Sequence, residues 1–507
     1  MLISLPDNQY KPKAWGDAVE KKSDGVDGDW RLEYQGMLEE LDGVSLRELR
    51  SKDWGGRKFL IFPSVASEKE LDKKDNFVFK LKWERGANRD KEPPAFLTDN
   101  VMGFFGLGGS LRMRITSRFD LNGKNTFLHY MLQKVCNVAV APQTDRDEDE
   151  FYDFLPYLFP QYLQEACKQG IFRAYVTREY NDANVRGAID VSRHIRYNIP
   201  FNGKIAYHTR EYTTDNPMTQ LVRHTIEFLR AGGYGAILDS DADVRDDVRA
   251  IEAATESYSR SERAKVVSKN LRPLTHPYYT AYEQLRLLCL AILRRDRLSY
   301  GDMDDEPIAG ILFDGAALWE EYLAKVFEEG GLGLVHSNNR TGGSGIALFD
   351  GGRRTYYPDF YRKGEGETAE ERAEHGIVLD AKYKRLCRAK EEPAATEETA
   401  DEAGEELEFN GEEAPVFARP GRDDLYQMLG YMHCLPAGAA VLLNPYSVSA
   451  KRKGVAESNP LKACGFGGEI SIMGIPIWTG AETFDAFSNA MKDVEKSLCE
   501  MALKAVV

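Results

Sequence analysis

Three side chains in the last third of the chain have the types and the spacing for metal-assisted phosphate chemistry. Asp359 follows a proline in the segment TYYPDF, and Asp380 and Lys382 lie two residues apart in the segment IVLDAKYK. The second segment has the pattern of a β-strand, and residues two apart on a strand point to the same side. Two carboxylates on adjacent strands can hold Mg²⁺ through oxygen atoms, and a nearby ammonium can stabilise an attacked phosphate. A surface hairpin with charged edges is the alternative for so short a pattern.

The elements around these residues are predicted from periodicity and from helix start and stop signals. Asp314 is a good N-cap for an amphipathic helix that should end at Gly330-Gly331. A second helix should end before Pro436, and a buried strand should follow it. The predicted order is a helix over 316–329, strand-forming runs at 332–335 and 355–382, a helix over 423–434, a strand over 439–443, a strand pair within 469–478 and a terminal helix over 484–503.

The rest of the chain divides into a β-rich first region and a mainly helical middle region. The Gly-rich run at 103–110 lacks the G-K-[ST] ending of a phosphate loop, so we interpret it as a turn leading into a strand. No other stretch has a Walker A motif, and nucleotide hydrolysis by the chain itself is not expected. Strands are predicted over 58–62, 77–83 and 111–115, and helices from 126 and over 152–169, 217–230 and 277–295.

Composition limits the class of protein but leaves nucleic acid open as a partner. The formal net charge is −15, and it is concentrated in two acidic segments, 364–375 and 391–415. Because the remaining sequence is close to neutral, the acidity does not exclude DNA. The 391–415 segment has few apolar residues and is predicted to be a disordered insertion. The seven cysteines form no CxxC pair, and neither a signal peptide nor a membrane-spanning stretch is found; we therefore expect reduced thiols and a cytoplasmic protein.

The predicted order of helix, three strands, helix and strand resembles the αβββαβ core of the PD-(D/E)xK nucleases. The resemblance implies that a glutamate of the first helix faces the metal, and Glu320 in LWEEYL fits this position better than Glu321. In RecB-like members the later helix carries Q-x-x-x-Y, which Gln427 and Tyr431 match one helical turn apart.

The match can be narrowed to one family. The segments PDF, VLDAKYK and DDLYQMLGYM, together with VRGAID at 185–190, make residues 125–507 similar to McrC, most strongly after 306. McrC is the nuclease subunit of McrBC-type, modification-dependent restriction systems. The resemblance implies a DNA endonuclease that works in phage defence with a hexameric McrB-like AAA+ GTPase, uses GTP only through that partner, and cuts double-stranded DNA for which modified cytosine is a candidate mark.

The resemblance also assigns roles to the site residues. One or two Mg²⁺ ions would be held by Asp359, Asp380, Glu320 and the carbonyl of Ala381, while Lys382 would orient the attacking water. Gln427 and Tyr431 would position these groups or contact the DNA backbone. Phosphate contacts are expected from basic side chains, although a solvated face is the commoner explanation for such residues: Arg353, Arg354, Lys384, Arg385, Arg186 and Arg193.

The fold expected from the sequence is therefore a multidomain α/β protein with three regions. Residues 1–120 form a β-rich domain that docks DNA or a partner, 121–305 a helical partner-binding region, and 306–507 the nuclease domain. Two alternative functions are a standalone RecB-like repair nuclease and a non-catalytic regulatory subunit that stimulates the motor. The intact Asp359, Asp380 and Lys382 argue against the second alternative.

Overall fold

A computed structural model describes most of the chain: residues 2–8, 12–21, 36, 38–51, 54, 58–62, 76–83, 94–107, 111–119, 125–138, 150–239, 241–294, 308–337, 345–347, 355–364, 375–384, 386–389, 404–407, 415–464 and 468–504. The chain forms two compact units. Unit 1 comprises residues 1–135, 141–147 and 301–507, and unit 2 comprises 136–140 and 148–300. No described helix is both long enough and apolar enough to cross a bilayer.

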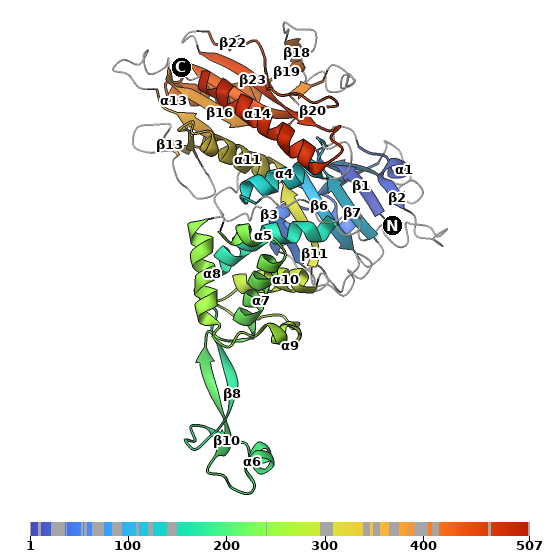
Figure 1. Ribbon diagram of the computed structural model, residues 1–507. Coiled ribbons are helices and arrows are strands. Elements are labelled where there is room, and N and C mark those ends of the chain that lie inside the picture. The colour runs from blue at the N-terminus through green and yellow to red at the C-terminus, as the bar shows by residue number, and fades with distance from the viewer. Residues whose placement is uncertain are drawn as a thin grey trace. The chain divides into compact units, whose positions relative to one another are not determined.

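Unit 1 contains a first, six-stranded sheet (Figure 1). Five of its strands come from the predicted first region, 1–120, and one comes from the predicted last region, 306–507. Its strands follow the order β2-β1-β7-β6-β11-β3, so β11 lies between β6 and β3 although it comes after unit 2 in the sequence. The buried cluster beneath this sheet includes Phe59, Phe105, Met113 and Leu312. The bounds are β1 Leu2–Pro6, β2 Val19–Lys21, β3 Lys58–Phe62, β6 Val101–Leu107, β7 Leu111–Thr116 and β11 Ile308–Asp314.

The six-stranded sheet differs from two predictions, one about the Gly-rich run at 103–110 and one about the domain boundary at 305/306. Part of the Gly-rich run is strand β6 and not a turn, and Gly103 allows its close approach to β11, since a Cβ there would lie 2.1 Å from the carbonyl oxygen of Ile311. The backbone of Gly103 has φ +143°, which disfavours other residues. The predicted boundary at 305/306 also differs from the compact units, because 308–314 shares a sheet with 1–120 and 126–135 lies in unit 1. Shorter elements nearby are α1 Trp15–Ala18, α3 Leu46–Ser51, β4 Phe79–Lys82 and β5 Ala95–Thr98.

The second large sheet of unit 1 carries the residues predicted to act. Its order is β12-β15-β16-β20-β23-β21, with β22 also paired to β23. Strands β16, β20 and β23 are parallel to one another, whereas β12, β15 and β16 pair antiparallel. The bounds are β12 Val335–His336, β15 Phe360–Arg362, β16 Ile377–Ala381, β20 Ala439–Val448, β21 Ala456–Glu457, β22 Leu461–Lys462 and β23 Glu469–Trp478.

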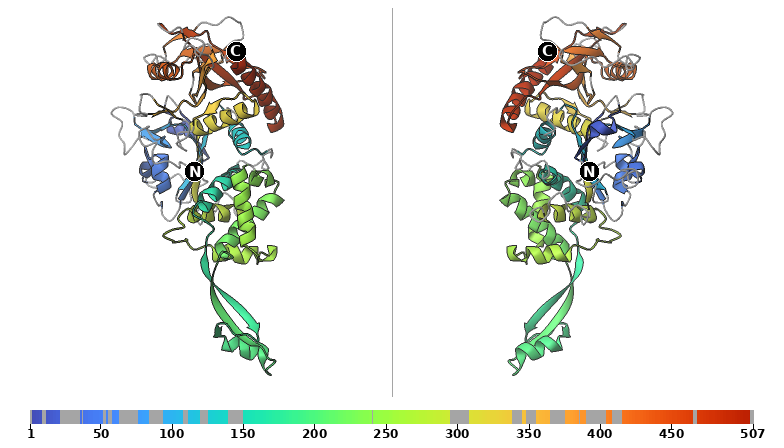
Figure 2. Two further views of the ribbon diagram at one scale, coloured as in Figure 1. Left: turned by 90° about the vertical axis from the view of Figure 1, so that its left-hand side faces the viewer. Right: turned by 90° about the vertical axis from the view of Figure 1, so that its right-hand side faces the viewer.

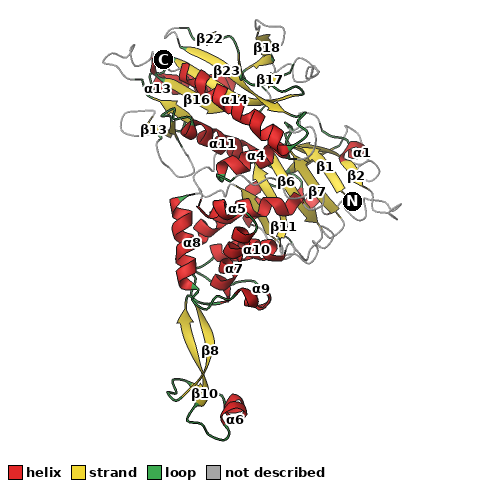
Figure 3. Ribbon diagram, in the orientation of Figure 1, coloured by secondary structure: helices red, strands yellow, loops and turns green. Residues whose placement is uncertain are grey.

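Helices bury both faces of this sheet, as Figure 3 shows for the long terminal helix. Strands β20 and β23 are buried along almost their whole length, which is typical of parallel strands covered on both faces. Helix α13 packs through Met428 and Met432 on Val378 and Leu442, while α11 and α14 contact β16 and β23. The helix bounds are α4 Thr126–Val135, α11 Gly315–Glu329, α13 Arg422–Cys434 and α14 Phe484–Lys504.

The sequence predicted most of these elements, and the structure corrects two of them. The side chain of Asp314 accepts a hydrogen bond from the backbone N–H of Ala317, as expected of an N-cap. The predicted strand pair within 469–478 is wrong, because these residues form the single strand β23. The 391–415 segment is not wholly irregular, since β18 Gly404–Leu407 pairs with β19 Val416–Arg419, which also pairs with β17 Cys387–Arg388. The remainder of 391–415, apart from residue 415, lies outside the described residues. A further pair is β13 Ile346–Ala347 with β14 Thr355–Tyr356.

Unit 2 is a helical body from which a long two-stranded ribbon extends (Figures 1 and 2). The ribbon strands pair over nine residues, from Ala174↔Thr213 to Asp182↔Ile205. A short strand and helix α6 lie at the end away from the body. The bounds are α5 Glu150–Cys167, β8 Ala174–Asp182, β9 Ala188–Ile189, α6 Val191–Asn198, β10 Ile205–Thr213, α7 Pro217–Ala231, η2 Gly235–Asp239, α8 Ala242–Ala254, η3 Arg260–Glu262, α9 Arg263–Lys269 and α10 Ala281–Arg294.

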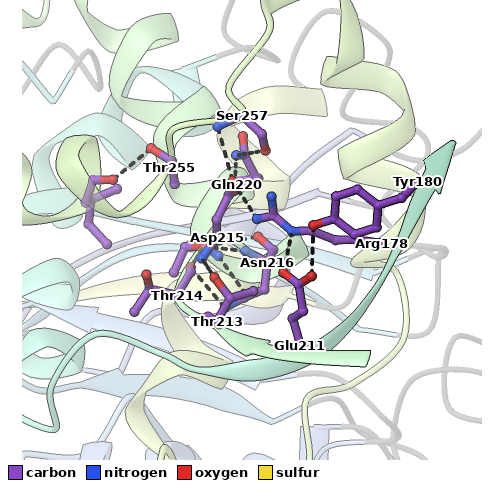
Figure 4. A network of polar contacts seen from close by, with 12 residues as sticks. Arg178, Tyr180, Glu211, Thr213, Thr214, Asp215, Asn216, Gln220, Thr255 and Ser257 are labelled. Carbon is purple, nitrogen blue, oxygen red and sulfur yellow. Dashed lines mark hydrogen bonds and ion pairs between the residues drawn. The ribbon is translucent and has the colours of Figure 1, made fainter. Parts of the chain in front are cut away.

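A polar network fixes the base of the ribbon to the helical body (Figure 4). Arg178 of β8 lies 3.2 Å from Asp215, which precedes α7. Asp215 also accepts hydrogen bonds from the side chain of Gln220 at 2.6 Å and from the backbone N–H of Ser257 at 3.1 Å. Although burial alone would raise the pKa of Asp215, these hydrogen bonds and Arg178 lower it. The carboxylate therefore joins three separate segments of unit 2.

Candidate active site

The candidate site forms where β15 and β16 meet, because their pairing brings the two predicted aspartates together. Asp359 directly precedes β15, and Asp380 is the fourth residue of β16, next to Leu379, which pairs with Phe360. The Oδ2 atom of Asp359 accepts a hydrogen bond of 2.7 Å from the backbone N–H of Ala381. This bond ties the loop before β15 to the end of β16.

Lys382 lies just past the end of β16 and faces Asp380, as their spacing predicted. Its Nζ is 2.5 Å from Oδ2 of Asp380. The backbone N–H of Lys382 donates to the carbonyl of Leu443 on β20, at 2.8 Å. Lys382 is thus held both through its backbone and through its side chain, and Asp380, which is 1 % exposed, has an ion pair well shielded from water.

The site gathers three carboxylates, of which Asp380 is buried and Asp359 and Glu320 are half-buried. Burial raises the pKa of Asp359 well above its ordinary value, and Asp380 and Glu320 raise it further. Burial likewise raises the pKa of Asp380, although the neighbouring Lys382 opposes that rise. Burial alone would lower the pKa of Lys382, but the charge of Asp380 outweighs it and raises the pKa. Asp359, Asp380 and Glu320 therefore lie close enough to interact, and the group favours a positive charge.

Helix α13 supplies the predicted Gln427 and Tyr431, and both reach the site. The side-chain oxygen of Gln427 accepts from Lys382 at 3.0 Å, and its amide nitrogen donates to the hydroxyl of Tyr431 at 2.8 Å. The Tyr431 hydroxyl donates in turn to the carbonyl of Tyr357 at 3.3 Å. Burial raises the pKa of Tyr431, so the phenol stays protonated and can act as this donor. A continuous chain of hydrogen bonds runs from Lys382 to the loop that contains Asp359.

Glu320 of α11 contacts a residue that the sequence analysis did not single out. One Glu320 carboxylate oxygen lies 3.0 Å from Nε2 of His336 on β12. The His336 ring stacks on Phe360, with centroids 5.0 Å apart. His336 therefore lies between the helix glutamate and the strand that follows Asp359. Its position at the end of an apolar run gave no signal, because the contact depends on how α11 packs on the sheet.

Asp424 is a second residue of the site that was not predicted. It lies one helical turn before Gln427, and its Oδ1 is 3.7 Å from Nζ of Lys382. Its Oδ2 is 2.6 Å from Nζ of Lys384. The i, i+3 spacing of Asp424 and Gln427 in the segment DDLYQ was the available signal, since such residues share a helix face.

The first sheet of unit 1 also reaches this segment. Arg118, which follows β7, donates to the carbonyl of Tyr383, and its guanidinium lies 4.6 Å from the centre of the Tyr383 ring. The Tyr383 hydroxyl lies 3.0 Å from the hydroxyl of Ser117. Residues 117–118 thus hold the backbone between Lys382 and Lys384, and the first region is part of the support for the site.

The predicted DNA contacts are only partly described. Arg353, Arg354 and Arg385 lie outside the described residues, and Lys384 pairs with Asp424. In unit 2, Arg186 contacts the hydroxyl of Tyr207 at 3.2 Å and Arg193 pairs with Glu179 at 3.4 Å. Both arginines therefore have partners within the ribbon, and their contact with DNA remains a prediction.

The donor set fits a divalent cation by its chemistry. Asp359, Asp380 and Glu320 offer the oxygen atoms that Mg²⁺ prefers. Burial raises the pKa of both aspartates, and so does repulsion by neighbouring carboxylates, which a bound cation would relieve. Among the described residues, no three His, Cys, Asp or Glu side chains are already arranged as a metal-binding group. Lys382 supplies the positive charge beside Asp380. The Ala381 carbonyl as a ligand remains a prediction.

These features define a multidomain α/β protein with a buried carboxylate–lysine site. Residues 97–402 match the family described as McrBC 5-methylcytosine restriction system component. The matched segment is more than half of the chain, and the chain belongs to this family. No curated protein matches it.

Two solved structures from Thermococcus gammatolerans are similar at low identity. The first, a refined half-complex from a tetradecameric assembly of McrB AAA+ hexamers with bound McrC, is 16% identical with a TM-score of 0.39 and covers 99% of this chain and 100% of that chain. The second, a cryo-EM structure of the McrBC complex, is 15% identical with a TM-score of 0.24 and covers 65% of this chain and 88% of that chain.

Proposed function

We propose that the chain is the DNA-cutting subunit of a McrBC-type restriction system, with a PD-(D/E)xK nuclease core in the last 200 or so residues. The observation that carries the proposal is the buried Asp380–Lys382 ion pair next to Asp359, on adjacent strands of one sheet. Among the strands of the second large sheet and the helices beside them, the order α11, β12, β15, β16, α13, β20 supports it, because it is the αβββαβ order expected for this fold.

Each residue of the site has its own role in the proposed phosphodiester hydrolysis. Asp359, Asp380 and Glu320 would hold one or two Mg²⁺, which when bound lower the pKa of water and offset charge on the phosphate. Lys382 orients the attacking water and stabilises the negative charge that develops on the phosphate oxygens. Gln427 fixes the Lys382 ammonium, and Tyr431 connects Gln427 to the loop that precedes Asp359.

The proposed partner is a McrB-like AAA+ GTPase hexamer, and GTP enters the reaction only through it. Support comes from the family to which the chain belongs and from the ribbon of unit 2, whose outer part exposes large apolar side chains. Such side chains gathered in one segment mark a protein interaction site. They are Val191, Ile195 and Tyr197 of α6 and, just after it, Ile199 and Phe201. The substrate would be double-stranded DNA with modified cytosine as the candidate mark, and the reaction would take place in the cytoplasm.

The test is cleavage of methylated plasmid DNA with Mg²⁺, GTP and a McrB-type partner. Asp380→Ala and Lys382→Ala should each lower the cleavage rate by about a thousandfold or more, because each removes a charge that acts on the transition state. Matched controls are Asp423→Ala, at an exposed position of α13, and Lys325→Ala, at a half-buried position of α11 whose ammonium pairs with Glu328.

Circular dichroism and partner binding should be unchanged in all four variants. Cleavage at the normal rate by Asp380→Ala or Lys382→Ala would refute the proposed nuclease function. Cleavage by the unaltered chain with Mg²⁺ alone would instead favour the standalone repair nuclease, since that enzyme needs no GTPase.

A further inference from the structure

One ammonium group in the candidate site faces two carboxylates on different elements. Nζ of Lys382 lies 2.5 Å from Oδ2 of Asp380, on β16, and 3.7 Å from Oδ1 of Asp424, on α13. Both aspartates are buried, Asp380 at 1 % and Asp424 at 6 % exposure. Lys382 is therefore in close contact with Asp380, while Asp424 lies at a longer ion-pair distance from the same ammonium.

This arrangement conflicts with cation binding by Asp380. A divalent cation and the Lys382 ammonium would compete for the same buried carboxylate, and two positive charges at short range repel strongly where water is excluded. For Asp380 to accept the cation, Lys382 must give up its close contact. Gln427 is neutral and already accepts from Lys382, so it cannot replace the lost charge.

Asp424 has the negative charge and the position to become the ion-pair partner of Lys382 in place of Asp380. We propose that Asp424 is a positioning residue that takes over Lys382 when a divalent cation binds Asp380, and that it thereby sets the affinity of the site for the cation. This inference rests on the proposed function, because it assumes that Asp380 is a cation ligand.

Two features hold Asp424 ready for this role. Its other oxygen, Oδ2, is fixed by Lys384 at 2.6 Å, which leaves Oδ1 on the side of Lys382. Asp424 also lies in the first turn of α13, where the helix dipole stabilises a negative charge. The carboxylate is therefore held in place, with one oxygen toward Lys384 and the other toward Lys382.

The experiment is a double-mutant cycle measured by calorimetry with Ca²⁺ alone, on the full chain and without DNA. Ca²⁺ takes the same oxygen ligands. In the unaltered chain, Asp424→Asn should weaken Ca²⁺ binding by about tenfold, because Lys382 then stays on Asp380. In a Lys382→Met background, the same change should alter the affinity by less than about twofold, since no ammonium competes.

Asp423→Asn is the matched control, because it removes an exposed carboxylate one residue away in the same helix turn. It should leave Ca²⁺ affinity unchanged, and thermal melting should confirm that every variant folds. Unchanged affinity in Asp424→Asn would overturn the inference and leave the proposed function in place. An equal loss in both backgrounds would also overturn it, because Asp424 would then act on the cation directly. An unaltered chain that binds no Ca²⁺ would overturn the inference together with the proposed cation site.

Discussion

Strands β16 and β20 of unit 1 are buried over nearly their whole length. In unit 2, by contrast, β8 alternates between half-buried and exposed residues, and β10 does so after the buried Ala206 and Tyr207. In the first pair, helices on both faces exclude water, so charges placed among the strands interact strongly. In the second pair, stability comes from cross-strand contacts such as the stacked rings of Tyr180 and Tyr207, 5.4 Å apart. The buried pair is suited to chemistry and the exposed pair to contact with another molecule.

The largest expected difference concerns the effect of one polar substitution in each region. Leu442→Asn on β20 should lower the free energy of unfolding by about 4 kcal/mol, because it removes a fully buried apolar side chain and buries an amide. Ile195→Asn on α6, where the side chain is 55% exposed, should change it by less than about 0.5 kcal/mol. Urea denaturation followed by circular dichroism measures both. Equal losses would show that the ribbon depends on its apolar residues for folding.

A smaller effect is expected where the ribbon meets its helical body. Asp215→Ala should cost about 2 kcal/mol locally, because Arg178, Gln220 and the Ser257 N–H all lose a buried acceptor. Hydrogen exchange of the β8 and β10 amides should become faster. Asp182→Ala, at the end of the ribbon away from Asp215, is the control and should leave exchange near the base unchanged. Unchanged exchange in Asp215→Ala would mean that strand pairing alone fixes the ribbon.

The smallest expected effect concerns the candidate site, where the charge of Asp359 should lower the melting temperature of the metal-free protein. Without metal, Asp359→Asn should raise the melting temperature by about 3 °C, because it removes a buried charge that Asp380 and Glu320 repel. The raised pKa of Asp359 means that the folded chain binds this proton more readily than the unfolded chain. The native protein therefore loses stability as pH rises through the interval from the unfolded to the folded pKa.

The gain from Asp359→Asn should accordingly be largest at neutral and alkaline pH and should shrink as pH falls below the raised pKa. Melting curves in EDTA between about pH 5 and pH 8, taken beside Asp423→Asn, make the comparison. A destabilised Asp359→Asn would show that its hydrogen bond to Ala381 outweighs the repulsion.

Much of the candidate site could be predicted because its signals are local. The spacing of Asp380 and Lys382 on a strand, and of Gln427 and Tyr431 on a helix, determines which side chains share a face, and the structure pairs both sets. The spacing of Asp424 from Gln427 was a local signal of the same kind that was not used, whereas His336 and Arg118 could not be found in this way. Their roles depend on which helix or sheet lies against β16, and one sequence carries no local mark of such packing.

In the fold, too, local features could be predicted and long-range pairing could not. Helix ends with a cap or glycine stop were predicted within a few residues, as at α11 and α7. The sheet to which β11 belongs was not predicted, because its partners β3 and β6 lie some 200 residues or more earlier in the chain, and hydrophobic patterns do not encode such long-range pairing. Strand β23 was divided in error because Gly474 and Pro476 resemble turn residues, whereas in the sheet they lie within one buried strand.

The place of β11 between β6 and β3 has a consequence for synthesis on the ribosome. The six-stranded sheet lacks an inner strand until residues 308–314 have emerged, while unit 2 is continuous over 148–300 and can fold before then. During that interval the edges of β3 and β6 that β11 later covers remain without their partner strand. Nascent chains halted before 308 should therefore need protection by chaperones at this sheet, and release of the next few dozen residues should remove that need.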